Sequence, residues 1–160
     1  MEQLIKAMLS WLEGAGFAAA RQMPEGMFPE LEGTVVAVGM EKAEAKEAGL
    51  FSYLGVTEAE GRQVSLYGRR LEAEISLEVM CPQRLGAKQC MQTADALLTK
   101  LAGGVEAVAL RKLTMGGCRY EADADCFCCK VSAQAEAYVY ALANEDETEF
   151  TDFMLKGEVR

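Results

Sequence analysis

The distribution of hydrophobic and polar residues along the chain predicts two amphipathic helices. Residues 2–13 place apolar side chains at the i, i+1, i+4, i+7 and i+8 positions of one helical face, and Gly14 and Gly16 follow as a natural stop. A second helix is predicted after Pro82 and ends at the glycine pair 103–104. The apolar stripe of this second helix comprises Leu85, Cys90, Met91, Ala94, Leu97, Leu98 and Leu101.

Strict alternation of apolar and polar residues predicts the strands. The clearest stretch is 71–81, whose odd-numbered residues are apolar or cysteine while the residues between them are mainly glutamates. Residues 34–40 are β-branched and apolar, and we expect this strand to continue through the segment EKAEAKEAG, because a nine-residue helix without an apolar stripe would be marginal. A further strand is predicted over 105–115, before Gly116 and Gly117.

The thiol-rich hexapeptide CFCCKV, residues 126–131, is predicted to begin a long strand. From Phe127 to position 141 every second residue is apolar, and the intervening set is mostly polar, as in a strand with one solvated face. Cys129 is therefore expected in the core. Cys126 and Cys128 are expected to share the outer face, with α-carbons roughly 6.5 to 7 Å apart, at the limit of disulfide reach.

The remaining segments are expected to be connections or a terminal strand. Residues 16–33 lack a sustained period and are expected to form a surface connection, and 49–61 to form an exposed loop with buried aromatic anchors. Residues 1–143 are predicted to form one domain. Residues 144–160 are predicted to be an acidic linker and a C-terminal strand, which pairs either with its own sheet or with a neighbouring subunit.

Together these elements predict an α+β fold with two layers. The order of helix, long strands, helix and further long strands packs most simply as a mainly antiparallel sheet with both helices on one face. At 160 residues, with 51% hydrophobic residues, the chain is long enough to bury a core of this kind.

Charge and hydropathy exclude several classes of function. The formal net charge of −9 is expected to repel phosphate backbones and anionic lipid surfaces. Charged residues interrupt the apolar positions of the first helix, so we expect no export signal, and no segment is long and apolar enough for a membrane span. We therefore expect a cytoplasmic protein with reduced thiols and without a membrane partner.

The candidate chemistry is weak. A hairpin over residues 119–125 would bring Cys118 towards Cys126 and Cys128, but this chain lacks the paired C-x2-4-C spacing of structural zinc sites, so a metal site built on these three thiols is kept only as an alternative. Histidine is absent, so the usual nucleophilic triads have no base, and the alternating glutamates of 71–81 suit a solvated face better than acid–base catalysis. We expect neither an enzyme nor a cofactor.

A resemblance adds a functional expectation. The segment GRRLEAEISLEVMCPQRLGAKQCMQTADALLTKLAGG, followed by a strand pair, resembles the tail terminator (tail completion) proteins of long-tailed phages and prophages, and GLFSYLG and FTDFMLKGEV resemble segments of prophage tail-region proteins. The resemblance implies a structural protein that assembles in the bacterial cytoplasm and remains in a virion tail or a phage-tail-like particle. Such a protein forms a ring, often of six subunits, which caps the tail tube and joins it to the head connector. DNA would pass through the ring without specific binding, which the acidic charge suits.

Three regions are candidates for subunit contacts: the glutamate face of the strand 71–81, the loop around Phe51 and Tyr53, and the terminal strand. The basic cluster of Arg69 and Arg70, which precedes that strand, could also contact an acidic partner. The individual candidates are Phe51, Tyr53, Arg69, Arg70, Glu72, Glu74, Phe150, Phe153 and Leu155. Two alternatives to an assembly protein remain at this point. One is a cysteine-dependent metal-binding or redox module, and the other is a small-ligand-binding domain with the same two layers.

Overall fold

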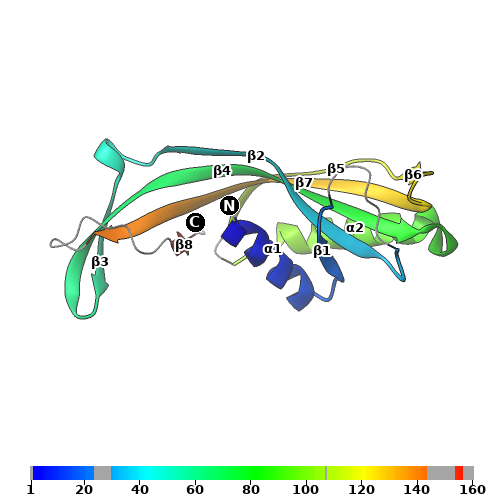
Figure 1. Cartoon of the computed structure of the whole chain (residues 1–160), viewed down its shortest axis with the longest axis horizontal. Coiled ribbons are helices and arrows are strands. Elements are labelled where there is room, and N and C mark those ends of the chain that lie inside the picture. Colours follow the sequence, from blue (N-terminus) through cyan, green and yellow to red (C-terminus); the bar gives the residue numbers. More distant parts are fainter. Residues whose placement is uncertain (1, 24–29, 107, 144–153, 157–160) are drawn as a thin grey trace.

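The computed structural model describes residues 2–23, 30–106, 108–143 and 154–156, and in this part of the chain one long sheet carries two helices on one face (Figure 1). The sheet has eight strands in the order β1-β2-β4-β7-β5, with β3 beside β4 and with β6 and β8 beside β7. All pairs are antiparallel except β1 with β2. This confirms the predicted two-layer α+β class.

The elements follow the chain in the order α1 (Glu2–Gly14), β1 (Ala19–Arg21), β2 (Val35–Glu47), η1 (Leu50–Ser52), β3 (Tyr53–Ala59), β4 (Arg62–Pro82), η2 (Gln83–Leu85), α2 (Gly86–Ala102), β5 (Ala109–Met115), β6 (Arg119–Glu121), β7 (Cys126–Ala143) and β8 (Met154–Lys156).

The core lies between the two helices and one face of the sheet, which is the face that the alternation of apolar and polar residues predicted to be buried. On β4 the odd-numbered residues from Leu71 to Cys81 are buried, and on β7 Cys129 and Val131 lie on the same face. Helix α1 contributes Leu4, Met8 and Leu12 to this core, and α2 contributes Cys90, Ala94, Leu97 and Leu101. The continuous pairing of β4 with β7 from Ser65↔Ala143 to Pro82↔Cys126 keeps the two apolar sets on one side.

The sheet extends well past the helices. With 21 residues, β4 spans about 70 Å, and its first third runs beyond the helical layer together with the end of β7 and all of β3 (Figure 1). We call this extension the arm; it comprises residues 50–70 and 138–143. A two-residue turn at Glu60 and Gly61 joins β3 to β4, and both residues have positive φ, as a type I′ hairpin turn requires. Figure 1 shows that the arm bends towards the side of the sheet on which the helices lie.

Several strand and loop predictions were confirmed or corrected. The strand from residue 34 does continue through the EKAEAKE segment as β2, because β4 pairs with it as far as Glu47↔Arg69. The expected loop over 49–61 is wrong: it forms η1 and β3, which continue the edge of the sheet along β4. Its expected aromatic anchors, Phe51 and Tyr53, are exposed.

Other boundaries also differ from the expectations. The connection over 16–33 contains a three-residue strand, β1, which is held in register by the edge of β2 and is too short to have its own sequence signal. The strand expected from residue 105 begins at Ala109. Two residues of the predicted stripe are exposed: Leu85 lies in η2, before α2 begins, and Met91 lies on α2 but away from the Cys90 face, which packs on the sheet. The described part of the C-terminal strand, β8, pairs with β7 of its own chain.

Candidate functional site

The first candidate surface is an exposed apolar patch on the arm. Leu50 and Phe51 are 81% and 86% exposed, and Tyr53, Val56 and Tyr67 are also exposed. The rings of Tyr53 and Tyr67 meet edge to face, with centroids 5.6 Å apart. Exposed apolar patches of several hundred square ångströms usually mark contact sites for another protein. We call these five residues the arm patch.

The backbone under this patch is strained. Phe51 and the next residue, Ser52, have φ of 55° and 62°, in the left-handed region that costs a non-glycine residue about 1–2 kcal/mol. Burial of the Phe51 side chain does not offset this strain, because that side chain points almost wholly into solvent. Strain of this kind is typical of residues that are held in place for a contact.

The second candidate surface is the face of the sheet away from the helices, which we call the outer face. A chain of ion pairs crosses it from β2 to β5. Lys46 donates a hydrogen bond to Glu72 at 2.6 Å, and Arg70 lies 2.9 Å from the same carboxylate and 3.7 Å from Glu136. Arg111 then donates to Glu136 at 2.8 Å. The hydrogen bond from Lys46, supported by its charge, lowers the pKa of Glu72 below its usual value.

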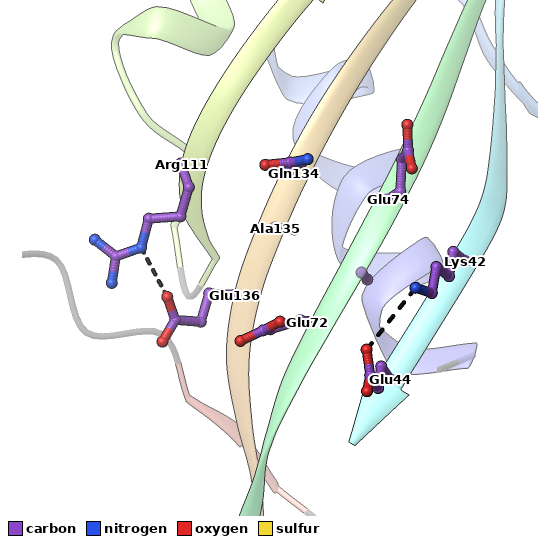
Figure 2. A pocket seen from close by; sticks show the side chains of 9 residues that line it. Lys42, Glu44, Glu72, Glu74, Arg111, Gln134, Ala135 and Glu136 are labelled. Atoms are coloured by element: carbon purple, nitrogen blue, oxygen red, sulfur yellow. Dashed lines mark hydrogen bonds and ion pairs between the residues drawn. The ribbon is translucent and has the colours of Figure 1, made fainter. Parts of the chain in front are cut away.

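A hollow of about 290 Å³ opens in the middle of this outer face (Figure 2). Its charged lining residues are Lys42, Glu44, Glu72, Glu74, Arg111 and Glu136. Five of these six residues take part in ion pairs on the outer face, whereas Glu74 has no ion pair or hydrogen bond within the described part of the chain. We call this feature the outer-face hollow. Four carboxylates and two cations leave its lining with a net charge of −2, with one carboxylate unpaired.

The thiols do not form the site that the alternative hypothesis required. Cys126 and Cys128 lie on the outer face, with their Sγ atoms 3.4 Å apart. Cys118 instead packs on the helix side of the sheet, in the same hydrophobic core as Cys129. The three candidate ligands are therefore divided between the two faces of β7. No three histidine, cysteine or acidic side chains converge as a metal-binding group anywhere in the described ranges.

The outer pair of thiols is buried, which the sequence pattern did not indicate. Cys126 and Cys128 pack with Ala37 and Met80, and Leu31 and Ala124 lie against this small cluster. Burial raises the pKa of both thiols, so both remain protonated at neutral pH. On the helix side, Cys90 donates to the carbonyl oxygens of Val79 and Phe127, and burial likewise raises its pKa. Protonated, buried thiols behave as small apolar side chains rather than as nucleophiles.

The predicted contact residues fall into separate groups. Phe51 and Tyr53 lie in the arm patch, Arg70 and Glu72 take part in the ion-pair chain, and Glu74 lines the hollow. Arg69 lies on the helix side of the arm and is exposed. Phe150 and Phe153 lie outside the described residues. The backbone of Leu155 pairs with that of Val139. No pattern in the sequence indicated the outer-face hollow, because the hollow forms only where β2, β4, β7 and β5 lie side by side in the sheet.

Comparisons with known proteins leave the family open. No model of a known protein family matches this chain, and no curated protein matches it. No helix in the described ranges is long and apolar enough to cross a lipid bilayer.

Proposed function

We propose that this protein is a non-enzymatic assembly protein of a phage or prophage tail, namely the terminator that caps the tail tube and joins it to the head. In this role it forms a ring with copies of itself in the bacterial cytoplasm and remains in the finished tail or tail-like particle. It needs no cofactor, and DNA passes through the ring without specific binding.

One observation carries the proposal: the sheet projects beyond its helices as an arm that presents Leu50 and Phe51 to solvent on a strained backbone. An extension of this kind adds little core to its own domain, since Val64 is the one buried residue among residues 50–70. It does supply apolar contact area for a second protein, and aromatic side chains are the residues that most often carry the affinity of such contacts.

The remaining features agree with a structural role. The outer-face hollow is open and lined by charges that are mostly paired with each other, which does not suit a small-ligand pocket, because such pockets are mainly apolar and enclosed. The divided and protonated thiols do not favour the cysteine-dependent alternative. The overall acidic charge suits a ring through which DNA must slide.

The proposal is tested with tail tubes assembled from the tube protein encoded near this chain. The wild-type protein should cap one end of the tubes in negative-stain electron micrographs, and Phe51→Ser should abolish capping. Met91→Ser is the matched control, because this side chain is also exposed but lies on α2, outside the arm. Tubes that remain uncapped by the wild-type protein, or a gene placed within a metabolic operon without tail genes, would contradict the proposal.

A further inference from the structure

Three residues of the arm patch, Tyr53, Val56 and Tyr67, lie on the face of the sheet opposite to the outer-face hollow. Arg69 follows the same alternation as the core residues Leu71 and Ala73, so it lies on the helix side, as do Tyr67 and its cross-strand partner Tyr53. Glu74 lies on the outer face, with its cross-strand partner Gln134. Because the sheet separates them, the Arg69 and Glu74 side chains of one chain cannot meet.

Charge separates the two surfaces further. By the alternation, Arg62 and Arg70 lie on the outer side of the arm and Glu58 shares the helix side with Arg69, so the positive charge of the docking face is local to the Arg69 guanidinium. Within the described residues neither Arg69 nor Glu74 takes part in an ion pair; Glu47 is the register partner of Arg69, but the two do not approach within ion-pair distance. An exposed guanidinium on one face and an unpaired carboxylate in a hollow on the other face are complementary.

Shape and area agree with this pairing. The arm bends towards the helix side, so its helix-side face is concave and its outer face is convex (Figure 1). The exposed parts of Tyr53, Val56 and Tyr67, with Arg69 beside them, amount to roughly 400 Å², about half of what one partner contributes to a standard protein interface. The charged surface around the hollow can supply the remaining area as a polar rim.

We propose that the helix-side face of the arm docks on the outer face of a second copy of this chain, so that Arg69 enters the outer-face hollow and pairs with Glu74 of that copy. The contact joins unlike surfaces, front to back, so each copy keeps one free surface of each kind. Contacts of this head-to-tail type generate a closed ring when the rotation between copies closes. The inference rests on the proposed function only for the role of the ring, because self-association can be measured on the free protein.

The test is a charge exchange followed by sedimentation velocity over a range of concentrations. Wild-type protein should associate, and Arg69→Glu and Glu74→Arg should each raise the dissociation constant about tenfold or more, since each turns an attraction into a repulsion. A chain carrying both substitutions should associate again.

An equimolar mixture of the two single variants should also associate. The arm of the Arg69→Glu variant carries the new carboxylate, and it fits the hollow of the Glu74→Arg variant, which carries the new guanidinium. The opposite contact, between the unchanged arm of the second variant and the unchanged hollow of the first, is the native one. Restored association in the mixture also shows that both variants are folded.

Arg62→Glu is the matched control. It removes an arginine of the same strand, but one on the outer side of the arm by the alternation, and it should leave the dissociation constant within about twofold of the wild-type value.

Three results would overturn the inference: a wild-type protein that stays monomeric, an Arg69→Glu variant that fails to associate while Glu74→Arg behaves as wild type, and single variants whose mixture does not associate. The second result would mean that Arg69 contacts a surface other than the outer-face hollow. The failure of this inference is separable from that of the proposed function, because tube capping depends on Phe51 and is measured without reference to Arg69 or Glu74.

Discussion

Replacing Cys128 tests most directly whether the thiols serve as packing or as chemistry. The side chain is 2% exposed, and its Sγ atom contacts that of Cys126 at 3.4 Å in a cluster of apolar groups. Cys128→Ala removes one sulfur atom, close in size to a methylene, and should cost about 1–2 kcal/mol through lost burial and a small cavity. Cys128→Ser leaves a hydroxyl in the same apolar cluster and should cost about 1–3 kcal/mol more than the alanine variant.

The measurement is thermal or urea unfolding of the two variants beside the wild-type protein. For a chain of this length each kcal/mol corresponds to a shift of about 2–4 °C in Tm, so the serine variant should melt several degrees below the alanine variant. Equal losses in the two variants, together with stoichiometric zinc in the wild-type protein, would refute the packing argument, since either substitution removes a ligand. Thiol titration of the native protein offers a second check, because the half-buried Cys118 should react first and Cys128 only after unfolding.

Three further predictions concern the helical layer, the arm and the outer face. Leu97→Ala should destabilise the protein by about 3 kcal/mol in urea unfolding, whereas Met91→Ala on the same helix should change it by less than about 0.5 kcal/mol, because only Leu97 is buried; equal effects would contradict the orientation of α2. Gly68→Ala should destabilise the root of the arm, since a Cβ there would clash with the backbone oxygen of Val139 on β7, and unchanged unfolding would contradict the close approach of these strands. The hydrogen bond between Lys46 and Glu72 lowers the pKa of Glu72 and raises the pKa of Lys46, so the pair should stabilise the fold above the ordinary carboxyl pKa of 4.5. This contribution should be lost as the pH falls through the lowered pKa of Glu72, and lost again as the pH rises through the raised pKa of Lys46. Lys46→Met should remove the low-pH part of this dependence in unfolding experiments at low salt, where screening is weakest.

Alternation predicted the faces of the long strands because a period of two fixes the side of each residue whatever strand lies beside it. Val131 and Ala133 are buried for this reason, although their neighbours on β4 and β5 are far away in the sequence. The same rule placed Cys126 and Cys128 on the outer face correctly. It failed on their burial, because most of the groups that pack on them, Leu31, Ala37 and Met80, come from distant parts of the chain.

The prediction for the exposed aromatic residues was wrong for a related reason. Large apolar side chains are most often buried, which is why Phe51 and Tyr53 were expected to anchor a loop. Their exposure depends on how far the helical layer reaches, which is a property of the whole fold. The outer-face hollow was equally invisible in the sequence, because β7 lies between β4, which carries Glu74, and β5, which carries Arg111, although β7 follows both strands along the chain.

The reach of the helical layer follows from simple lengths, and it connects the fold with the proposed role. Helices of 13 and 17 residues are about 20 and 26 Å long, far shorter than the roughly 70 Å of β4. The sequence of β4 agrees, because its core-facing positions are apolar from Leu71 onward but carry Arg69 and Gln63 before it. The stretch of this strand that lies beyond the helices gains backbone pairing but little burial. The arm is therefore better explained by contacts with other chains than by the stability of this one.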